Sequence, residues 1–389
     1  MYFLLDDYTS HGTDIDSFKK EAELFDKHTS IIPVYTCDMH ILDYFKISPT
    51  KVLFHDIKDD QLTYTEDGKY IVTDMMAIRT DSLSEEQMSL IKELRYKSKT
   101  LFEFSSSVVK RFFVGETILK TLSSKTNGVG GQFIKNVGSV RNYALLSAIQ
   151  NETESMNLLY RSDGRLNKAM AVFSKKTVFC ARMAVAEAIE ALFPKTANIY
   201  WKISQQCTEV YVELQNLVCG EFYKGYLFRI SDTGFCADTL FTTLRKYDCQ
   251  PNDYYTLGEI SLASDTYDKN GKLTYSGIVN EKGAIRIEEL KKRILTSDAY
   301  NLQLIEKQRK YFKECKLTTK ELSNKIGLTS VMGVKTKIVV MKDINDKGIS
   351  DPIDFYDYLV SLPKMPILSE YQRTTYRDFL KSIAARAAG

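Results

Sequence analysis

The sequence predicts an α+β fold with a central, mostly antiparallel sheet flanked by helices, a smaller N-terminal α/β region and a helical C-terminus. Three observations favour this class. Hydrophobic residues make up 44% of the 389 residues, which is enough to build packed cores. Short segments of alternating polarity recur in the middle of the chain, separated by Asp-Gly or Asn-Gly pairs. Longer segments with apolar residues at helical spacing accompany and follow them.

The same patterns divide the chain into four regions. About 150 residues is an ordinary domain size, so the length fits two or three folded domains. The predicted regions are a mixed α/β part (1–101), a linker or mobile loop rich in Gly, Ser and Lys (102–153), a central α+β domain (154–315) and a mostly helical end (316–389).

The first region begins with an apolar run that Asp6 and Asp7 interrupt at once. This pattern favours a first strand over a signal peptide, which needs a longer apolar segment. The predicted elements that follow are a helix over residues 17–27, strands over 51–56 and 70–74, and a helix from Ser82 to Leu101.

An Asp-Gly pair marks the first hairpin of the central region. Asp163 and Gly164 lie between two alternating segments, and Gly tolerates the positive φ that a tight turn needs. An Ala-rich helix follows, and Pro194 ends it. The predicted strands lie at residues 156–161, 166–173, 199–203, 209–214, 222–230 and 238–244, with the helix at 181–193. We therefore expect one central sheet over residues 154–280.

The last third of the chain contains a second strong turn pair, Asn270-Gly271, which predicts a hairpin of residues 259–266 and 272–278. A capping-box pattern at Thr318 and Glu321 begins a short helix that Gly327 ends. The remaining predicted elements are a strand over residues 335–341, where β-branched residues cluster, and helices over 285–315, 352–362 and 369–383. Residues 318–327 resemble the first helix of a helix-turn-helix, but a strand after them does not fit that motif.

Charge and cysteine usage narrow the class of protein. The net charge is only +3, which argues against a wholly basic nucleic-acid coat protein. The seven Cys form no CxxC pair, so free thiols in a reducing cytoplasm fit better than disulfides or a zinc ribbon. No segment approaches the roughly 18 apolar residues of a membrane-spanning helix. We therefore expect a cytoplasmic protein with no membrane association.

No motif in the sequence predicts a cofactor or a standard catalytic centre. The Gly-rich segment 121–139 lacks the phosphate-binding pattern GxxxxGK[ST], and Phe133 replaces the third glycine of GxGxxG. No nucleotide cofactor is therefore expected. A nucleophile elbow of the form GxSxG is missing as well, so an enzyme is not the favoured class. A metal-dependent enzyme stays open as an alternative, because four His lie among acidic residues in the N-terminal region: His11, His28, His40 and His55.

Basic and aromatic residues alternate along the central strands. Sheets of this composition hold single-stranded nucleic acid in several folds, because rings stack on bases and cations contact phosphates. The basic Gly-rich loop is a further candidate to close over a bound strand. The predicted nucleic-acid-binding residues are Lys125, Lys135, Tyr160, Arg161, Arg165, Lys168, Lys202, Tyr223, Tyr226, Arg229 and Arg245.

Two short blocks carry a family resemblance. Residues 159–165 (LYRSDGR) with 171–174 (AVFS), and later Gly225 with residues 229–234 (RISDTG) and Arg245, resemble the signatures of the phage/plasmid-like protein family defined by a domain of unknown function. That resemblance implies a phage, prophage or plasmid origin, and with it the cytoplasm of a bacterial host cell, and it implies no specific activity. The order of several strands followed by a long helix is also similar to the core of single-strand annealing proteins, at the level of topology alone.

The leading hypothesis is sequence-tolerant binding of nucleic acid, with single-stranded DNA as the candidate ligand, in annealing or as an accessory to replication or recombination. A homo-oligomer along the strand would suit that role. The first alternative is a structural or host-interaction protein of a phage or other mobile element. The second alternative is the metal-dependent enzyme of the acidic N-terminal region.

Overall fold

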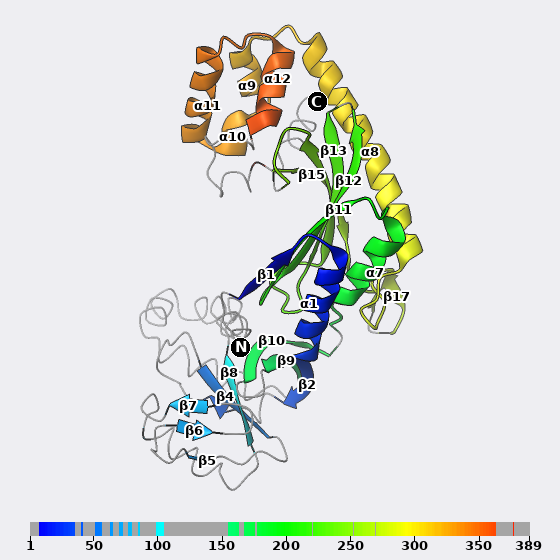
Figure 1. Ribbon diagram of the computed structural model, residues 1–389, viewed down its shortest axis with the longest axis vertical. Helices are drawn as coiled ribbons and strands as arrows, with labels where there is room; N and C mark the ends of the chain where they lie inside the picture. Colours follow the sequence, from blue (N-terminus) through cyan, green and yellow to red (C-terminus); the bar gives the residue numbers. More distant parts are fainter. Residues whose placement is uncertain are drawn as a thin grey trace.

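The computed structural model has an α+β architecture, as the sequence predicts (Figure 1). It describes residues 8–35, 40–41, 51–56, 63–64, 70–72, 77–79, 85, 99–104, 155–162, 167–175, 177–219, 221–251, 253–268, 270–362 and 376. Its main element is an antiparallel sheet in the order β1-β11-β12-β13-β14-β15. The strands are β1 (Thr9–Gly12), β11 (Asn198–Ser204), β12 (Thr208–Val218), β13 (Phe222–Ile230), β14 (Thr239–Lys246) and β15 (Tyr255–Ser261).

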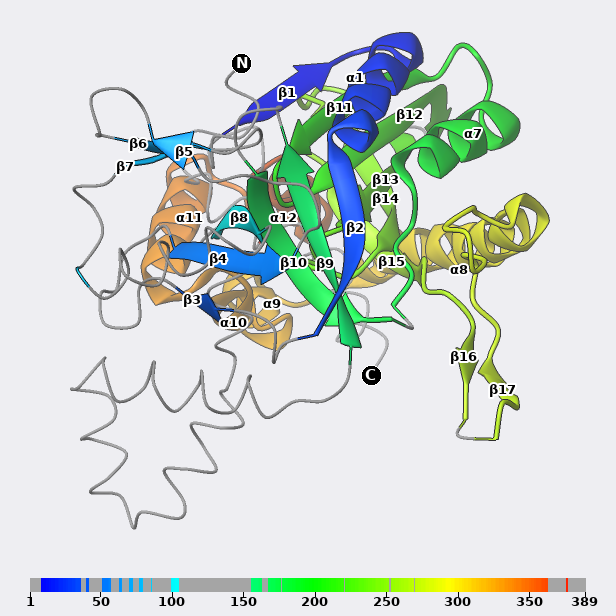
Figure 2. The ribbon, with the colours of Figure 1, turned by 90° about the horizontal axis from the view of Figure 1, so that it is seen from below.

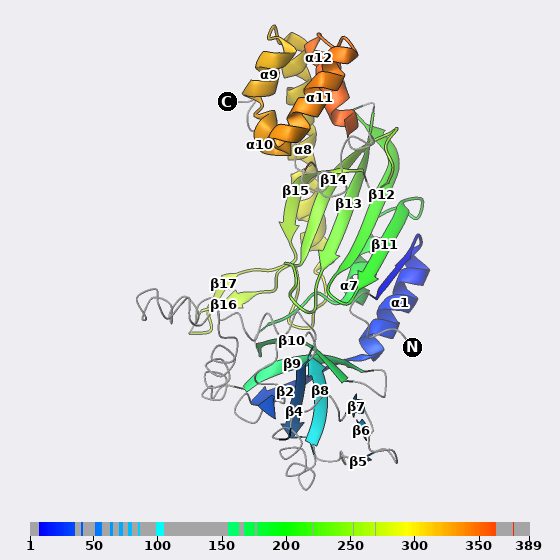
Figure 3. The ribbon, with the colours of Figure 1, turned by 90° about the vertical axis from the view of Figure 1, so that its left-hand side faces the viewer.

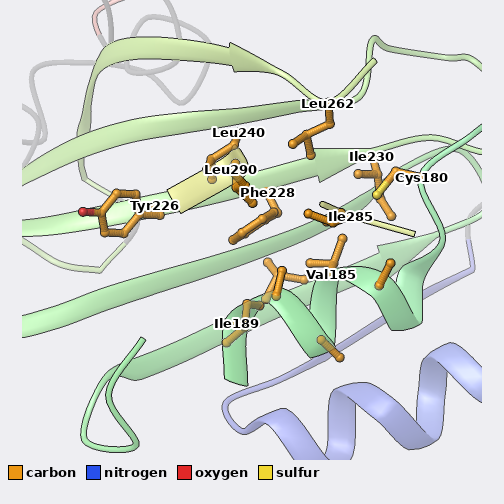
Figure 4. Packing of buried hydrophobic residues seen from close by; sticks show 14 of the residues in the cluster. Cys180, Val185, Ile189, Tyr226, Phe228, Ile230, Leu240, Leu262, Ile285 and Leu290 are labelled. Atoms are coloured by element: carbon orange, nitrogen blue, oxygen red, sulfur yellow. The ribbon is translucent and has the colours of Figure 1, made fainter. Parts of the chain in front are cut away.

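Three helices cover one face of this central sheet: α1 (Ile15–Lys27), α7 (Arg182–Leu192) and α8 (Ile287–Glu314). Figure 3 views the sheet from its other face, and α8 lies behind the strands there. Apolar side chains of α7 and the start of α8 pack on alternate residues of the strands, and we call this cluster the α7 core (Figure 4). Its members include Val185, Ile189, Phe228, Leu240 and Leu290.

Within the described part of the chain, a cap of four helices packs at one end of the central sheet (Figure 1). They are α9 (Thr319–Lys325), α10 (Leu328–Met332), α11 (Val334–Asp346) and α12 (Pro352–Ser361). Their apolar residues meet the C-terminal half of α8 and the nearby ends of β13, β14 and β15. This second cluster, the cap core, includes Phe222, Tyr255, Phe312, Leu328 and Leu359. Helix α8 therefore belongs to both cores.

A second sheet lies at the other end, in the order β2-β9-β10-β8-β4-β3. Its strands are β2 (Thr29–Tyr35), β9 (Ser155–Ser162), β10 (Asn167–Ser174), β8 (Lys99–Phe104), β4 (Lys51–Asp56) and β3 (His40–Ile41). Strand β9 pairs with β2, with Leu159 opposite Ile31. The prediction that residues 154–173 join the central sheet is therefore wrong. The hairpin of β9 and β10 forms as predicted, but it pairs with N-terminal strands that are distant in sequence.

The structure describes two further, smaller sheets. One consists of β5 (Thr63–Tyr64), β6 (Tyr70–Val72) and β7 (Ala77–Arg79), and the other is the hairpin of β16 (Thr266–Tyr267) and β17 (Leu273–Tyr275). Gly271 has a φ of +76° in that hairpin turn, which confirms the Asn-Gly prediction. The hairpin is shorter than predicted, because β15 ends at Ser261 and is a strand of the central sheet.

The described residues test several predictions of individual helices and strands. The helices at α7, α8 and α12 form, and Thr318 and Glu321 make the predicted capping box of α9. The predicted strand over residues 335–341 is wrong, because these residues belong to helix α11. The end of the predicted helix from Ser82 to Leu101 is wrong as well, since Lys99–Phe104 is strand β8. Residues 1–7 and the Gly-rich segment 121–139 lie outside the described residues.

Candidate interaction surfaces

The structure distributes the predicted nucleic-acid-binding residues over two sheets. Those of the second sheet are Tyr160, Arg161 and Lys168, and those of the central sheet are Lys202, Tyr223, Tyr226, Arg229 and Arg245. Lys125, Lys135 and Arg165 lie outside the described residues. The described members therefore do not form one continuous basic face.

Arg161 is fully buried where the second sheet meets the central sheet. Its guanidinium group donates to the backbone oxygen and the Oε1 of Gln205, at 2.6 and 2.8 Å. It also donates to both carboxylate oxygens of Asp232, at 2.8 and 2.9 Å. The prediction that Arg161 contacts phosphate from a solvent-facing strand is therefore wrong for this arrangement, because its donors are occupied by groups of the chain itself.

A second arginine, Arg182 at the start of α7, completes this junction. Its guanidinium nitrogens lie 3.1 Å from a carboxylate oxygen of Asp26 and 3.0 Å from one of Asp232. Both guanidinium groups lie over the ring of Phe25, at 5.1 and 5.0 Å from the ring centroid. Burial alone would raise the pKa of Asp232, but the two guanidinium groups outweigh it and lower that pKa to about 2. We call Asp26, Arg161, Arg182 and Asp232 the ionic junction.

A cavity of about 350 Å³ opens beside the ionic junction. Asp26, Arg182 and Asp232 line it together with Phe179 and Cys180. The charged residues of its wall are Asp26, Arg182, Asp232, Glu281 and Lys282, and the first three of them are paired within the ionic junction. The wall therefore offers no excess positive charge to attract a phosphate.

The face of the central sheet opposite the helices carries four of the predicted residues: Lys202, Tyr223, Arg229 and Arg245. Tyr226 points to the other face, because successive residues of a strand alternate in direction. It is buried in the α7 core, and its hydroxyl donates to Asp298 of α8 at 2.7 Å. The prediction that Tyr226 stacks on a base is therefore wrong for this arrangement.

Most charged and aromatic groups of this open face contact each other. Arg245 is buried and donates to both carboxylate oxygens of Glu213, at 2.6 and 2.8 Å, while its guanidinium lies over the ring of Tyr223. Arg229 likewise donates to Glu209 at 2.9 Å.

Three tyrosine rings of the same face form a stack. The ring of Tyr211 is stacked between those of Tyr200 and Tyr254, with centroid distances of 6.2 and 4.8 Å. Ring faces that are already stacked offer little surface to a base. On the described strands, the three cations of the open face (Lys202, Arg229 and Arg245) are matched by three anions (Glu209, Glu213 and Glu259).

Two elements each expose three large apolar side chains to solvent, and the sequence patterns predict neither exposed group. The first is the hairpin of β16 and β17, which extends away from the body (Figure 2). Its exposed residues are Tyr267 (60%), Leu273 (47%) and Tyr275 (38%). The second is one side of α11, where the exposed residues are Val334 (61%), Ile338 (63%) and Val339 (50%). The hairpin and α11 lie far apart (Figures 1 and 3).

The histidines of the metal hypothesis are spread over several elements. His11 is in β1, His28 caps α1, His40 is in β3 and His55 is in β4. His28 Nδ1 lies 2.6 Å from the backbone oxygen of Ser162. Within the described residues, no group of three or more His, Cys, Asp or Glu is placed to hold a metal ion. None of the described helices is long and apolar enough to cross a membrane.

Comparisons with known proteins give no match: no family model, no curated protein and no solved structure is similar to this chain.

Proposed function

We propose that this chain is a structural subunit that assembles with further copies of itself, and that the β16–β17 hairpin of one copy docks on α11 of the next. The observation that carries the proposal is the pair of exposed apolar patches on the hairpin and on α11. Contiguous apolar side chains on a protein surface are typical of contact sites, because their burial is favourable. A particle or interface protein of a phage or another mobile element, made in the bacterial cytoplasm, is the setting we propose.

The two patches differ in shape and lie far apart, which favours a head-to-tail contact. The hairpin projects from the body (Figure 2), whereas the patch on α11 is one side of a helix. A contact between two unlike patches repeats from copy to copy, so it generates rings or filaments. A symmetric dimer would instead bring each patch to its own equivalent.

Nucleic-acid binding has weaker support from the same residues. Arg161 and Arg245 are buried and paired with acids, and the open face matches its three cations with three anions. Affinity for a polyanion needs unpaired positive charge that releases counterions. We therefore propose assembly as the main role, and we use oligonucleotides as one arm of the test.

The assembly proposal is tested with one variant for each patch, measured by sedimentation velocity. Hairpin variant Tyr267→Ser/Leu273→Ser and helix variant Ile338→Gln/Val339→Gln each remove one side of the contact. We expect wild-type protein to form concentration-dependent oligomers and each variant alone to be a monomer. An equimolar mixture of the two variants should form a dimer, because one intact hairpin and one intact α11 remain. The matched control is Leu295→Gln, which replaces a residue of α8 that is 62% exposed and should leave assembly unchanged.

Three outcomes count against the proposal. Wild-type protein that stays monomeric at every concentration removes it. Variants that assemble like wild type show that neither patch is the contact. Assembly that occurs only with single-stranded oligonucleotides, and weakens steeply with salt, returns the nucleic-acid hypothesis to first place.

A further inference from the structure

Two cysteines far apart in sequence lie side by side at one end of the open face. The Sγ atoms of Cys207 and Cys236 are 3.7 Å apart. Cys207 ends the turn between β11 and β12, and Cys236 lies in the loop between β13 and β14. Both thiols are half-buried and line a surface cavity of about 280 Å³. A small reagent in this cavity would therefore meet both sulfur atoms.

Hydrogen bonds hold the two loops in a fixed relation. The backbone oxygen of Gln206 accepts from the hydroxyl of Ser231 at 2.6 Å and from that of Thr233 at 3.2 Å. The hydroxyl of Ser204 accepts from the backbone N–H of Cys207 at 3.1 Å and fixes the turn. These bonds hold the backbones of both loops together, so the two Cys residues remain neighbours.

The surroundings distinguish the two thiols. Lys202, Arg229 and Glu209 also line the cavity, so it contains two cations and one anion besides the sulfur atoms. The hydrogen bond with Cys207 lowers the pKa of Cys236, and the charge of Arg229 acts in the same direction. The same hydrogen bond, together with burial, raises the pKa of Cys207. Cys236 is therefore the thiol that becomes a thiolate first, and the thiolate is the reactive form.

We propose that Cys207 and Cys236 form a thiol–disulfide switch that hydroperoxides oxidise. The thiolate of Cys236 attacks the peroxide oxygen, the O–O bond breaks, an alkoxide or hydroxide leaves, and Cys236 becomes a sulfenic acid. Cys207 then attacks that sulfur, the S–S bond forms and water leaves with the thiol proton. In sum, two thiols lose two electrons and two protons, and the hydroperoxide becomes an alcohol and a water molecule.

The disulfide would act beside the ionic junction. Gln205, which binds Arg161, lies in the same turn as Cys207, and Asp232 lies in the same loop as Cys236. A covalent link between turn and loop restricts the unfolded chain and holds Gln205 and Asp232 in place around Arg161. Oxidation therefore stabilises the connection between the central and second sheets, independently of assembly through the hairpin and α11.

The test treats the full-length wild-type protein with hydrogen peroxide and maps its peptides by mass spectrometry. We expect a linked peptide pair containing Cys207 and Cys236, with a mass loss of about 2 Da because two thiol hydrogens leave. Dithiothreitol should reverse the change. We expect Cys236 to react at least about tenfold faster than Cys315, which is also half-buried. The urea midpoint of unfolding should rise on oxidation and return on reduction.

Two variants make the result specific. Cys236→Ser should abolish both the linked peptide and the shift of the urea midpoint, whereas the matched control Cys315→Ser should keep them. Cys207→Ser should leave a sulfenic acid on Cys236 that a dimedone reagent traps, because the second thiol is missing. Oxidised wild-type protein without the linked peptide, or equal reaction rates of Cys236 and Cys315, overturns the proposal without need of any variant.

Discussion

The two ends of the central sheet meet their neighbours through different kinds of contact. At the end toward the second sheet, Arg161 and Arg182 share the carboxylate of Asp232. At the other end, the cap core joins the strands to α8 and α12 through apolar residues such as Phe222 and Leu359. One end is therefore held by directional charged bonds, and the other by packing that depends on volume and buried area.

Different kinds of substitution should therefore destabilise the two ends. A buried ion network fails when one partner is removed, because the remaining charge stays out of water without compensation. An apolar contact fails in proportion to the cavity that a substitution leaves. Helix α8 contributes Leu290 to the α7 core and Phe312 to the cap core, so it is the continuous element that connects the two ends.

The largest effect is expected for Asp232→Ala at the ionic junction. This change leaves Arg161 fully buried and without its carboxylate partner, and it removes one of the two carboxylate partners of Arg182. We expect a loss of about 3 to 5 kcal/mol in the free energy of unfolding, measured by urea denaturation. The control is Glu289→Ala, which breaks an i,i+4 pair with Arg293 on α8. Equal losses for both variants would show that burial does not set the cost.

At the apolar end, we expect Leu359→Ala to cost about 2 to 4 kcal/mol, because Leu359 is fully buried in the cap core. The single Trp of the chain, Trp201, lies in the α7 core and reports on the far end of the molecule. If α8 couples the two ends, Trp201 fluorescence and far-UV circular dichroism shift to the same lower urea midpoint. A shift in circular dichroism alone would show that the ends unfold separately.

Local sequence patterns predict the elements of the central sheet well but do not predict what pairs with what. Strand β9 has the alternation of a hairpin strand, yet its partner β2 lies more than a hundred residues earlier in the chain. Register across such a separation depends on packing of the complete fold. The strand predicted over residues 335–341 failed for a related reason. Thr336, Val340 and Ile344 repeat every four residues and are buried as one side of α11, which outweighs the β-branched propensity.

The predicted nucleic-acid-binding residues do not share one open surface, because a sequence does not show which partner a charged residue has in the fold. The pairing of Arg245 with Glu213, and of Arg161 with Asp232, joins residues from different strands and loops. The alternation of strands does separate Tyr223 from Tyr226 onto opposite faces, since they are three residues apart. This alternation alone places the predicted nucleic-acid-binding residues of β13 on two faces of the sheet. The exposed apolar side of α11 could not be predicted, because residues 335–341 were predicted to form a strand.

Two carboxyl groups at the junction end should give opposite contributions to the pH dependence of stability. Burial raises the pKa of Asp238, which accepts from the backbone N–H groups of Cys180 and Ser231, to about 6. Folding therefore favours its protonated form, and this stabilisation is lost as pH rises from about 4 to about 6. Asp232 has the opposite sign: its lowered pKa of about 2 gives stability that is lost as pH falls below about 4.

We expect Asp238→Asn to remove about 1 to 3 kcal/mol of the change in unfolding free energy between pH 4 and pH 6, since one pKa unit corresponds to about 1.4 kcal/mol. The slope is the readout, because Asn also loses one acceptor oxygen and lowers the stability at every pH. Urea titrations at several pH values measure it. Leu359→Ala should keep the wild-type slope. An unchanged slope in Asp238→Asn would place the pH dependence elsewhere.

The smallest effect is expected for an ion pair that resembles the junction in chemistry but not in burial. Lys19 of α1 pairs with Glu190 of α7, and their side chains are 27% and 46% exposed. Water already solvates both charges, so Lys19→Ala should cost about 0.5 kcal/mol or less. A double-mutant cycle with Glu190→Ala isolates the pair from other effects of each change. A coupling energy between Lys19 and Glu190 as large as the loss for Asp232→Ala would mean that an ion pair is equally valuable whether it is buried or exposed. Burial of charge would then not explain why the junction end is sensitive to substitution, and the contrast between the two ends would lose its physical basis.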